Sequence, residues 1–164
     1  MIAAIFAIDD NGGMGFQGRL PWPHNKDDMR WFKRHTENEF VVMGRNTWES
    51  PDMPKPLPSR VNFVVTNRDI ECDEVIVLNG DIIKNLQELQ TARPDRNIYV
   101  IGGPSILHQV KPILQRVFVT RIPGEFQSDT NINFAEFIDG FSLVNTLHLE
   151  SCKIDDYTVY RGVV

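Results

Sequence analysis

The chain has few cysteines and no long apolar run, and both deficits limit the class of protein. Its 164 residues contain two cysteines, Cys72 and Cys152, which lie far apart and form no C-x-x-C pair. A disulfide framework or a zinc site is therefore not expected, and a reducing cytoplasm is the predicted location. No run of about 18 apolar residues occurs, so no membrane span is expected.

An excess of positive charge is also missing. The net charge is −5, so a nucleic-acid-binding surface is not expected, although a local basic cluster can still bind a small anion. The first segment, MIAAIFAIDD, lacks basic residues and reaches an acid at Asp9, which predicts a buried strand rather than a signal peptide. No repeat or linker divides the chain, so a single domain over residues 1–164 is predicted.

Short apolar segments, rich in β-branched and aromatic residues, alternate with helical patterns along the chain. Strands are predicted at residues 2–8, 40–44, 61–66, 75–78, 98–103 and 117–122. Helices are predicted over 27–35, after Gly44 as far as Pro51, from about Asp81, and after Pro104. This alternation is typical of an α/β fold with a largely parallel sheet covered on both faces. Two alternating segments around SCKIDD, residues 151–156, predict a C-terminal antiparallel hairpin, so the sheet is mixed.

Two adjacent acids, Asp27 and Asp28, begin the first predicted helix. At about 100° per residue, Asp28 lies among the apolar side chains of Met29, Trp31 and Phe32, and Asp27 lies on the opposite side. Asp27 has the ordinary explanation of a first-turn acid with an arginine three residues later. Asp28 requires hydrogen-bond donors because a buried, unpaired carboxylate is costly. Either backbone N–H groups at the helix start supply them, or a ligand does, and a flat amidine-like edge of a pterin or pyrimidine fits two parallel bonds.

Residues 9–22 form a glycine-rich segment, DDNGGMGFQGRLPW, directly after the first strand. No helix follows it at once, so it is not a strand–turn–helix dinucleotide fingerprint. It predicts a mobile loop closed by the stiffer Leu-Pro-Trp, the alternative being a long surface turn. Loops of this length in compact domains commonly act as lids or bind ligands.

Two later segments each place glycine between a buried strand and a helix start. These are FVVMGRNTWES, residues 40–50, and IYVIGGPSIL, residues 98–107. Free N–H groups at such helix starts bind phosphate, although one such turn alone is ordinary strand-to-helix chemistry. A third polar strand end, Thr66-Asn67-Arg68, adds a basic group that suits a 2′-phosphate. Together they predict a cofactor with several phosphates.

The ordered set of motifs resembles dihydrofolate reductase over nearly the whole chain, from Ile2 to about Tyr160. The motifs are LPW, Asp28 before WFK, MGRNTWES, PLPSR, VIGGPSI, VTRI and SDTNINF. The resemblance implies a single-domain fold with an eight-stranded mixed, mostly parallel sheet and four flanking helices. It also implies reduction of 7,8-dihydrofolate to 5,6,7,8-tetrahydrofolate by NADPH, with hydride transfer to C6 and water-mediated protonation of N5, in support of one-carbon metabolism and thymidylate synthesis. A cytoplasmic monomer that binds dihydrofolate and antifolate-like molecules follows from it, with no metal.

The resemblance also assigns roles at matching positions. Asp28 corresponds to the carboxylate that holds the 2-amino and N3 edge of the pterin, Thr120 to the hydroxyl bonded to it, and Trp22 to the tryptophan that holds a water beside the pterin. Arg60 in PLPSR corresponds to the arginine that binds the substrate's glutamate carboxylate, the alternative being an exposed surface arginine. The remaining implied substrate contacts are Ile5, Met29, Phe32, Ser50, Leu57 and Ile101.

On the cofactor side, the resemblance implies contacts from the first strand, the glycine-rich loop and the three polar strand ends. The implied residues are Ala7, Met14, Gly15, Gly18, Arg19, Leu20, Gly44, Arg45, Asn46, Thr47, Thr66, Asn67, Arg68, Gly102, Gly103, Pro104, Ser105 and Ile106. In the family, the two glycines that correspond to Gly102 and Gly103 are joined by a cis peptide bond.

The sequence departs from the family's pattern at a few positions. Leu107 replaces a usual aromatic residue near the nicotinamide, Ser59 replaces a common glycine, and the segment between Ser50 and Leu57 is longer and rich in proline. Competing interpretations are a related reductase of riboflavin synthesis, which lacks LPW followed by an Asp before WFK, and a non-catalytic folate or nucleotide carrier on the same fold. A structural subunit of a larger assembly is a third alternative.

Overall fold

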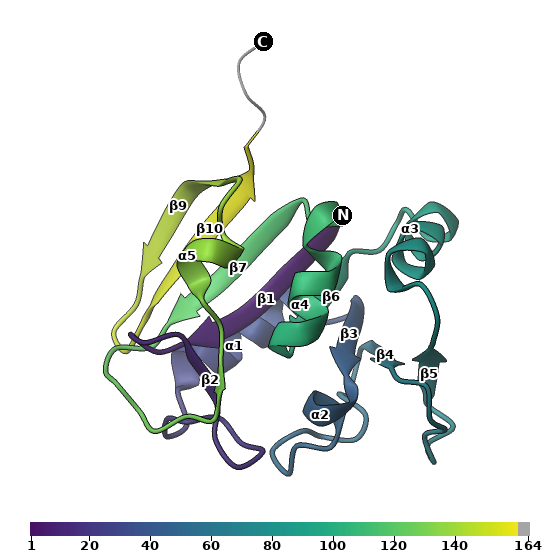
Figure 1. Ribbon diagram of the computed structural model, residues 1–164, viewed down its shortest axis with the longest axis horizontal. Helices are drawn as coiled ribbons and strands as arrows, with labels where there is room; N and C mark the ends of the chain where they lie inside the picture. Colours follow the sequence, from purple (N-terminus) through teal and green to yellow (C-terminus); the bar gives the residue numbers. More distant parts are fainter. Residues whose placement is uncertain (161–164) are drawn as a thin grey trace.

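The structure, a computed structural model, describes residues 1–160 and places eight strands in one mixed sheet (Figure 1). These strands are β1 (Ile2–Ile8), β3 (Phe40–Gly44), β4 (Val61–Val65), β5 (Val75–Leu78), β6 (Ile98–Gly102), β7 (Arg116–Arg121), β9 (Phe141–His148) and β10 (Lys153–Val159). Their order across the sheet is β5-β4-β3-β6-β1-β7-β10-β9. The six strands from β5 to β7 are parallel, and β10 pairs antiparallel with both β7 and β9. This is the predicted fold class, and the strand bounds agree with prediction to within one residue for the six parallel strands.

Four helices flank the sheet at the predicted places. They are α1 (Lys26–Thr36), α2 (Arg45–Trp48), α3 (Ile82–Ala92) and α4 (Pro104–Val110). In Figure 1, α1 lies behind the sheet while α4 lies in front of it, so both faces are covered. Each of the two longer helices begins where a side chain caps it, because Asn25 accepts a bond from Asp28 N–H and Asp81 accepts one from Lys84 N–H. Among the described residues, no helix is both long and apolar enough to cross a membrane.

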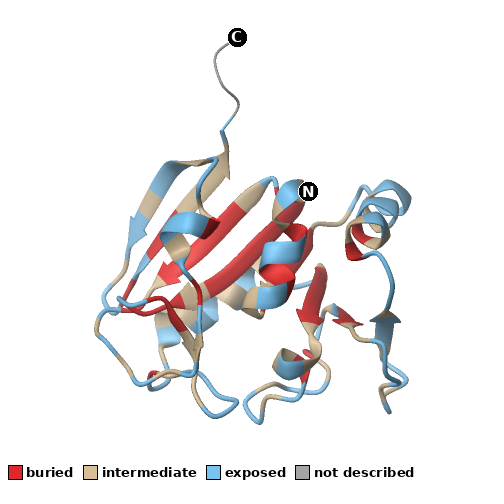
Figure 2. Ribbon diagram, in the orientation of Figure 1, coloured by how far each residue is buried: buried red, intermediate tan, exposed pale blue. Residues whose placement is uncertain are grey.

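The central strand β1 shows why its sequence is apolar throughout. Ile2, Phe6 and Ile8 point into the core on the α4 side, and Ala3 and Ile5 point into a second core cluster on the α1 side. Figure 2 shows buried residues along β1 and its neighbours. Because both faces are covered, alternation between apolar and polar residues is not needed.

The C-terminal hairpin is present, but its predicted turn is wrong. The connection spans residues 149–152, and Lys153–Asp156, predicted as turn, form the first half of β10. The acids that resembled a turn are accommodated in the strand because arginines on β7 pair with them, Arg121 with Asp155 at 3.3 Å and Arg116 with Asp156. The predicted second strand extended to residue 164, and its last four residues lie outside the described part.

Several short elements were not predicted. Within the glycine-rich loop, β2 (Gly13–Gly15) pairs antiparallel with β8 (Thr130–Asn131), which gives a small second sheet. The structure also contains a one-turn helix, α5 (Phe134–Phe137), and a 3-10 turn, η1 (Lys111–Ile113). Both are too short to produce a periodic signal in the sequence. The loop is therefore tied to a distant segment at its base.

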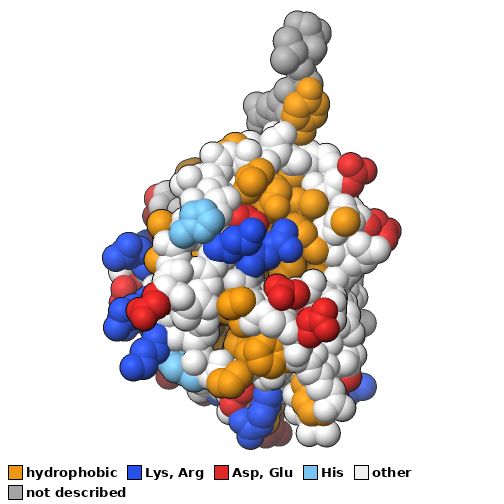
Figure 3. All heavy atoms as spheres, turned by 90° about the vertical axis from the view of Figure 1, so that its left-hand side faces the viewer, with side chains coloured by type: hydrophobic (Ala, Val, Ile, Leu, Met, Phe, Trp, Pro, Cys, Tyr) orange, Lys and Arg blue, Asp and Glu red, His pale blue; other side chains and the backbone are white. Residues whose placement is uncertain are grey.

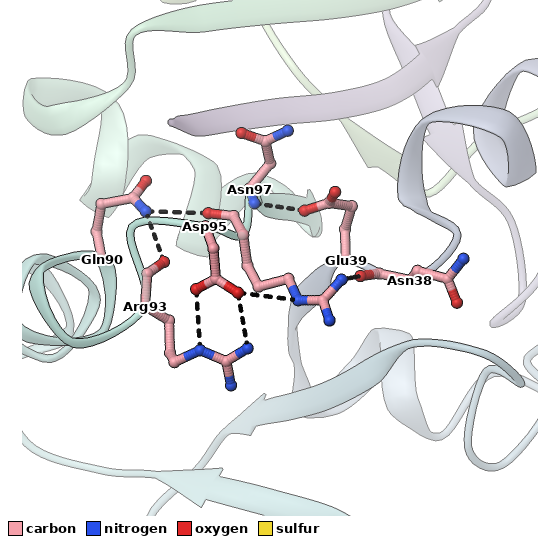
Figure 4. A network of polar contacts seen from close by, with 7 residues as sticks. Asn38, Glu39, Gln90, Arg93, Asp95 and Asn97 are labelled. Atoms are coloured by element: carbon pink, nitrogen blue, oxygen red, sulfur yellow. Dashed lines mark hydrogen bonds and ion pairs between the residues drawn. The ribbon is translucent and has the colours of Figure 1, made fainter.

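A polar network joins the end of α3 to the beginnings of β3 and β6 (Figure 4). Arg93 donates two bonds of 3.0 Å to Asp95, and Arg96 donates a 2.7 Å bond to the carbonyl of Asn38. The side chain of Glu39 accepts a bond from the N–H of Asn97. The network lies at the amino-terminal ends of β3 and β6, and the predicted cofactor turns lie at their carboxyl ends. Its role is therefore to stabilise the fold.

Candidate active site

Asp28 lies in the first turn of α1, half-buried, where its backbone N–H is bound by the cap at Asn25 at 3.0 Å. Burial raises the pKa of its carboxyl, and hydrogen bonding to the side chain of Thr120 opposes that rise. Within residues 1–160, no backbone N–H donates to this carboxylate, so the alternative in which the helix start satisfies it is not observed. The carboxylate retains free acceptor capacity for a ligand.

Thr120, the partner of Asp28, lies in the middle of the sheet. Thr120, 1% exposed on β7, lies opposite Ala7 of β1 on one side and opposite Ile154 of β10 on the other. Ala7 packs in the same apolar cluster as the buried Trp22. In the described part of the chain, the Trp22 indole N–H is buried without a hydrogen-bond partner. Because a buried donor left unpaired costs about 1 to 3 kcal/mol, this atom marks a place where a water or ligand acceptor binds.

The predicted apolar walls lie between α1 and the sheet. Ile5 and Leu57 are buried, and the half-buried Phe32 packs against the clusters that contain both of them, as does Ile101. Met29 was expected on the buried face of α1, but its side chain is 44% exposed. The apolar face of this helix is therefore partly open at the Asp28 end, and an apolar ligand surface would cover it.

Arg60 is held in place rather than free on the surface. Its Nε donates to the Thr36 hydroxyl at 3.1 Å, and one terminal nitrogen donates to the carbonyl of Pro58 at 2.7 Å. The guanidinium lies 5.7 Å from the ring centre of Phe32, and partial burial lowers its pKa from the usual value. A fixed guanidinium beside the apolar wall suits a carboxylate, and one terminal nitrogen is left to bind it. Ser50, another predicted contact, uses its carbonyl to accept from Lys55 at 3.2 Å.

The three predicted phosphate turns lie side by side because β4, β3 and β6 are adjacent and parallel. Gly44, Thr66 and Gly102 end or follow these strands at the same edge of the sheet. Two of these turns approach each other closely. A side-chain carbon added at Gly44 would lie 3.7 Å from the carbonyl of Gly102, and one added at Gly102 would lie 3.7 Å from the Thr47 hydroxyl. The Gly102–Gly103 peptide is cis, as the resemblance implied. Apart from the neighbouring residues in the chain, no atom of residues 1–160 lies within 4 Å of a carbon added at Gly103, so on the described part of the protein this turn faces open space.

Side chains of the predicted cofactor set differ in availability. Asn46, Asn67 and Arg68 are exposed, and the N–H of Arg68 donates to Thr66 at 3.1 Å. Arg45 is already paired with Glu49 at 2.7 Å, so its charge is shared. Ile106 is buried in the main core, so only its backbone is available. Leu107 is fully buried in the same core.

The glycine-rich loop is fastened at several points that the sequence did not indicate. Asp129 accepts from Gln17 N–H at 2.9 Å and donates its own N–H to the carbonyl of Gly15 at 2.9 Å. Arg19, predicted as a cofactor contact, is exposed and forms an ion pair with Asp52. Of the other predicted loop residues, Met14 packs against the core, Gly18 is exposed, and Leu20 is 45% exposed.

A buried carboxylate at the base of this loop was also missed as a fixing point. Asp9, 1% exposed, accepts from the N–H groups of Asn11 at 2.9 Å, Gly13 at 2.8 Å and Phe126 at 3.0 Å. The Asp-Asp-Asn-Gly signal for a turn was present in the sequence, but its distant partner at Phe126 was not visible there.

Comparison with known proteins agrees with this geometry. The family model for dihydrofolate reductase matches residues 1–160. Dihydrofolate reductase of Bacillus subtilis (strain 168) is 35% identical over 138 residues, covering 84% of this chain and 77% of that protein. Dihydrofolate reductase type 8 of Escherichia coli is 29% identical over 163 residues, covering 96% and 94%. A solved structure of dihydrofolate reductase from Enterococcus faecalis complexed with NADP(H) and RAB-propyl has a TM-score of 0.77 at 28% identity, covering 98% of this chain and 97% of that one.

The fold and the glycine turns at adjacent strand ends are those of an oxidoreductase that uses a dinucleotide cofactor. The chain belongs to the dihydrofolate reductase family, whose members are NADPH-dependent.

Proposed function

We propose that the protein reduces 7,8-dihydrofolate to 5,6,7,8-tetrahydrofolate at the cleft beside Asp28, with NADPH as reductant. The observation that carries the proposal is the half-buried Asp28 carboxylate, which is bonded to Thr120 and free to accept more bonds. A pterin's 2-amino group and N3–H present two parallel donors to such a carboxylate. The open apolar face of α1 and the walls at Ile5 and Leu57 fit the ring itself.

The residues present fit the cofactor. Gly44, Thr66 and Gly103 bring three polar turns to one edge, and the space in front of Gly103 is open. Helix starts at Arg45 and Pro104 direct backbone N–H groups outward from these turns, where phosphate oxygens bind. Exposed Arg68 beside Thr66 suits a 2′-phosphate. NADPH, when bound, supplies the hydride that C6 of the pterin accepts.

The chain's own contribution to the chemistry is orientation and protonation. Asp28 fixes the pterin edge and its negative charge increases the basicity of the ring. The proton for N5 comes from water, and the indole N–H of Trp22, which has no partner among residues 1–160, supports a role in orienting that water. The fastened loop of residues 13–20 limits solvent entry.

The outer part of the substrate meets Arg60, whose free terminal nitrogen donates hydrogen bonds to the glutamate carboxylate. Antifolate-like molecules with a diaminopyrimidine edge would occupy the same site as the pterin, since they offer the same pair of donors to Asp28. The product supports one-carbon metabolism and thymidylate synthesis, and we expect the enzyme to act as a cytoplasmic monomer.

The direct test is loss of NADPH absorbance when dihydrofolate is added, with NADH in parallel. We expect turnover with NADPH and a much lower rate with NADH, and we expect Arg68→Ala to narrow that difference. Binding of both molecules without turnover would indicate a carrier and contradict the proposal. Turnover of a riboflavin precursor in place of dihydrofolate would favour the related reductase.

A further inference from the structure

The turn between β9 and β10 grips the first turn of α1. Ser151 donates its backbone N–H to the Asp27 carboxylate at 3.1 Å, and its hydroxyl lies 2.5 Å from the same oxygen. The carbonyl of Ser151 accepts from the Asn25 side-chain amide at 3.3 Å. Every polar group of Ser151 is therefore used by the segment that begins α1. We call these contacts of Asn25, Asp27 and Ser151 the Ser151 clip.

The clip adds a stronger partner to the sequence-based interpretation of Asp27, which explained it by the helix end and Arg30. Hydrogen bonds from Ser151, and more weakly the charge of Arg30, hold the pKa of the Asp27 carboxyl below its usual value. Asp27 is thus charged at neutral pH, and its chief partner is a residue more than a hundred positions away. The helix end alone does not account for this geometry.

The same turn supports the inner side of the site. Cys152, directly after Ser151, is 7% exposed and packs with Trp22 and Ile122. Burial, together with the nearby charges of Asp28 and Asp27, raises the pKa of the Cys152 thiol to about 11. The thiol therefore stays neutral and acts as a small apolar support next to the carboxylate.

The clip also fixes the start of α1 relative to Thr120. Two residues after Cys152, Ile154 of β10 lies directly opposite Thr120 of β7. On the helix side, the Asn25 side-chain amide, which donates to the Ser151 carbonyl at 3.3 Å, also accepts the N–H of Asp28 on its oxygen at 3.0 Å. One short path of hydrogen bonds thus joins the backbone of Asp28 to the strand next to its side-chain partner.

We propose that the Ser151 clip positions the Asp28 carboxylate against Thr120, and that Asp27 and Ser151 are positioning residues of the reductase reaction. The inference rests on the role of Asp28 in the proposed function. The two adjacent acids have different roles. Asp28 contacts the substrate, and Asp27 holds the start of α1 in the position that brings Asp28 next to Thr120. Small displacements of a reacting group are costly to rate even when the altered residue lies outside the site.

The test compares Asp27→Ala, Asp27→Asn and Ser151→Ala in single-turnover hydride transfer from NADPH to dihydrofolate. Asp27→Asn loses the charge but keeps an oxygen that accepts from Ser151, so it separates the clip from the charge. We expect Asp27→Ala to slow hydride transfer about tenfold and Asp27→Asn to keep most of the rate. Ser151→Ala should slow the step, and the double variant Asp27→Ala/Ser151→Ala should be no slower than Asp27→Ala. Glu88→Ala on α3, an exposed acid with a 4.0 Å ion pair, is the matched control.

The pH profile of the same step provides a readout that general loss of stability would not move. A loosened helix start exposes Asp28 to water, so the apparent pKa of the rate should fall in Asp27→Ala and Ser151→Ala, and less in Asp27→Asn. Wild-type rates in Asp27→Ala and Ser151→Ala, or an Asp27→Asn as slow as Asp27→Ala, would overturn the clip. Asp28→Asn, run alongside, tests the proposed function itself. If Asp28→Asn is slow and Asp27→Ala is unaffected, the positioning role of the Ser151 clip is refuted and the proposed function stands. If Asp28→Asn is unaffected, both proposals are refuted.

Discussion

At the scale of single residues, the raised pKa of Asp28 means that ionising this carboxyl lowers the stability of the folded protein. The folded-state pKa lies above that of the unfolded chain, about 3.9, because burial disfavours the charged form. Between these two values the folded protein binds more protons than the unfolded chain, so stability falls as pH rises through that window.

The first prediction follows from that sign. Asp28→Asn should be more stable than the wild type at neutral pH, because the amide is not penalised as a buried charge. Its advantage should shrink on acidification and disappear below about pH 4, where both forms are neutral. Thermal unfolding of the two proteins across this pH range checks it; a variant less stable at neutral pH would contradict the assignment of burial as the cause.

Thr120 gives a second prediction at this scale. Thr120→Val keeps the shape of a fully buried side chain but removes the hydroxyl that stabilises the Asp28 carboxylate. The pKa of Asp28 should rise further, and kcat/KM for dihydrofolate should fall about fivefold to tenfold, equivalent to about 1 to 1.5 kcal/mol. A pH–rate profile measures both; an unshifted profile would show that the two side chains are not coupled.

Single residues were predictable where local periodicity was enough. The helical wheel selected Asp28 over Asp27 without reference to any other segment, and its position beside Thr120 agrees with that choice. Ser151, Asp129 and the partners of Asp9 were not predictable, because each acts through a contact across a long sequence separation. Met29 was expected to be buried and is exposed, because a helical wheel shows which way a side chain points but not whether another residue covers it.

At the scale of elements, Asp129 is one of the distant residues that hold the glycine-rich loop. Asp129→Ala removes the bonds that the carboxylate accepts from Gln17 N–H and from the Thr130 hydroxyl, and leaves the bond from its own N–H to Gly15. We expect faster amide exchange at Gln17, a slower hydride-transfer step, and a change in unfolding free energy below about 1 kcal/mol, because local openings need not involve the core. Asp139→Ala, another exposed acid, is the control. Unchanged exchange at Gln17 would show that the loop is held by other contacts.

The elements differ in how well the sequence predicted them. The parallel strands were found because burial on both faces makes them continuously apolar, as in β1. The start of β10 was missed because its acids are neutralised by arginines of the neighbouring β7, a pairing that depends on the register of the sheet. The strands β2 and β8 are only three and two residues long. Each is a strand only because it pairs with the other, so neither has a local sequence signal.

At the scale of the whole molecule, the strand order brings the site together. Residues from β1, β3, β4, β6, β7 and α1 meet only because β1 lies between β6 and β7, with β3 and β4 beyond β6. No local pattern specifies that order. The general rule that parallel strands carry their ligands at the carboxyl ends predicted the edge, but not which strands are neighbours.

The outer edge of the sheet sets a further whole-molecule prediction. On the edge strand β9, Leu143 and Val144 are each 53% exposed and Leu147 is 40% exposed, and Figure 3 shows hydrophobic and basic side chains together on that side of the molecule. The pairing of β9 with β10 shifts register between Asp156 and Tyr157, where Val144 of β9 is skipped, and this irregularity disfavours edge-to-edge pairing. Light scattering should therefore give the mass of one chain, and Leu143→Lys should leave mass and activity unchanged. A dimer that Leu143→Lys dissociates would contradict this expectation.

The central claim is that the Asp28 carboxylate holds the substrate for reduction, and single-turnover hydride transfer at neutral pH tests it most directly. With NADPH and dihydrofolate both saturating, Asp28→Asn should transfer hydride at least about a hundredfold more slowly than the wild type, the loss expected when one preorganised electrostatic group is removed. A rate within about twofold of the wild type, in a variant that is folded and binds both molecules, would contradict the account.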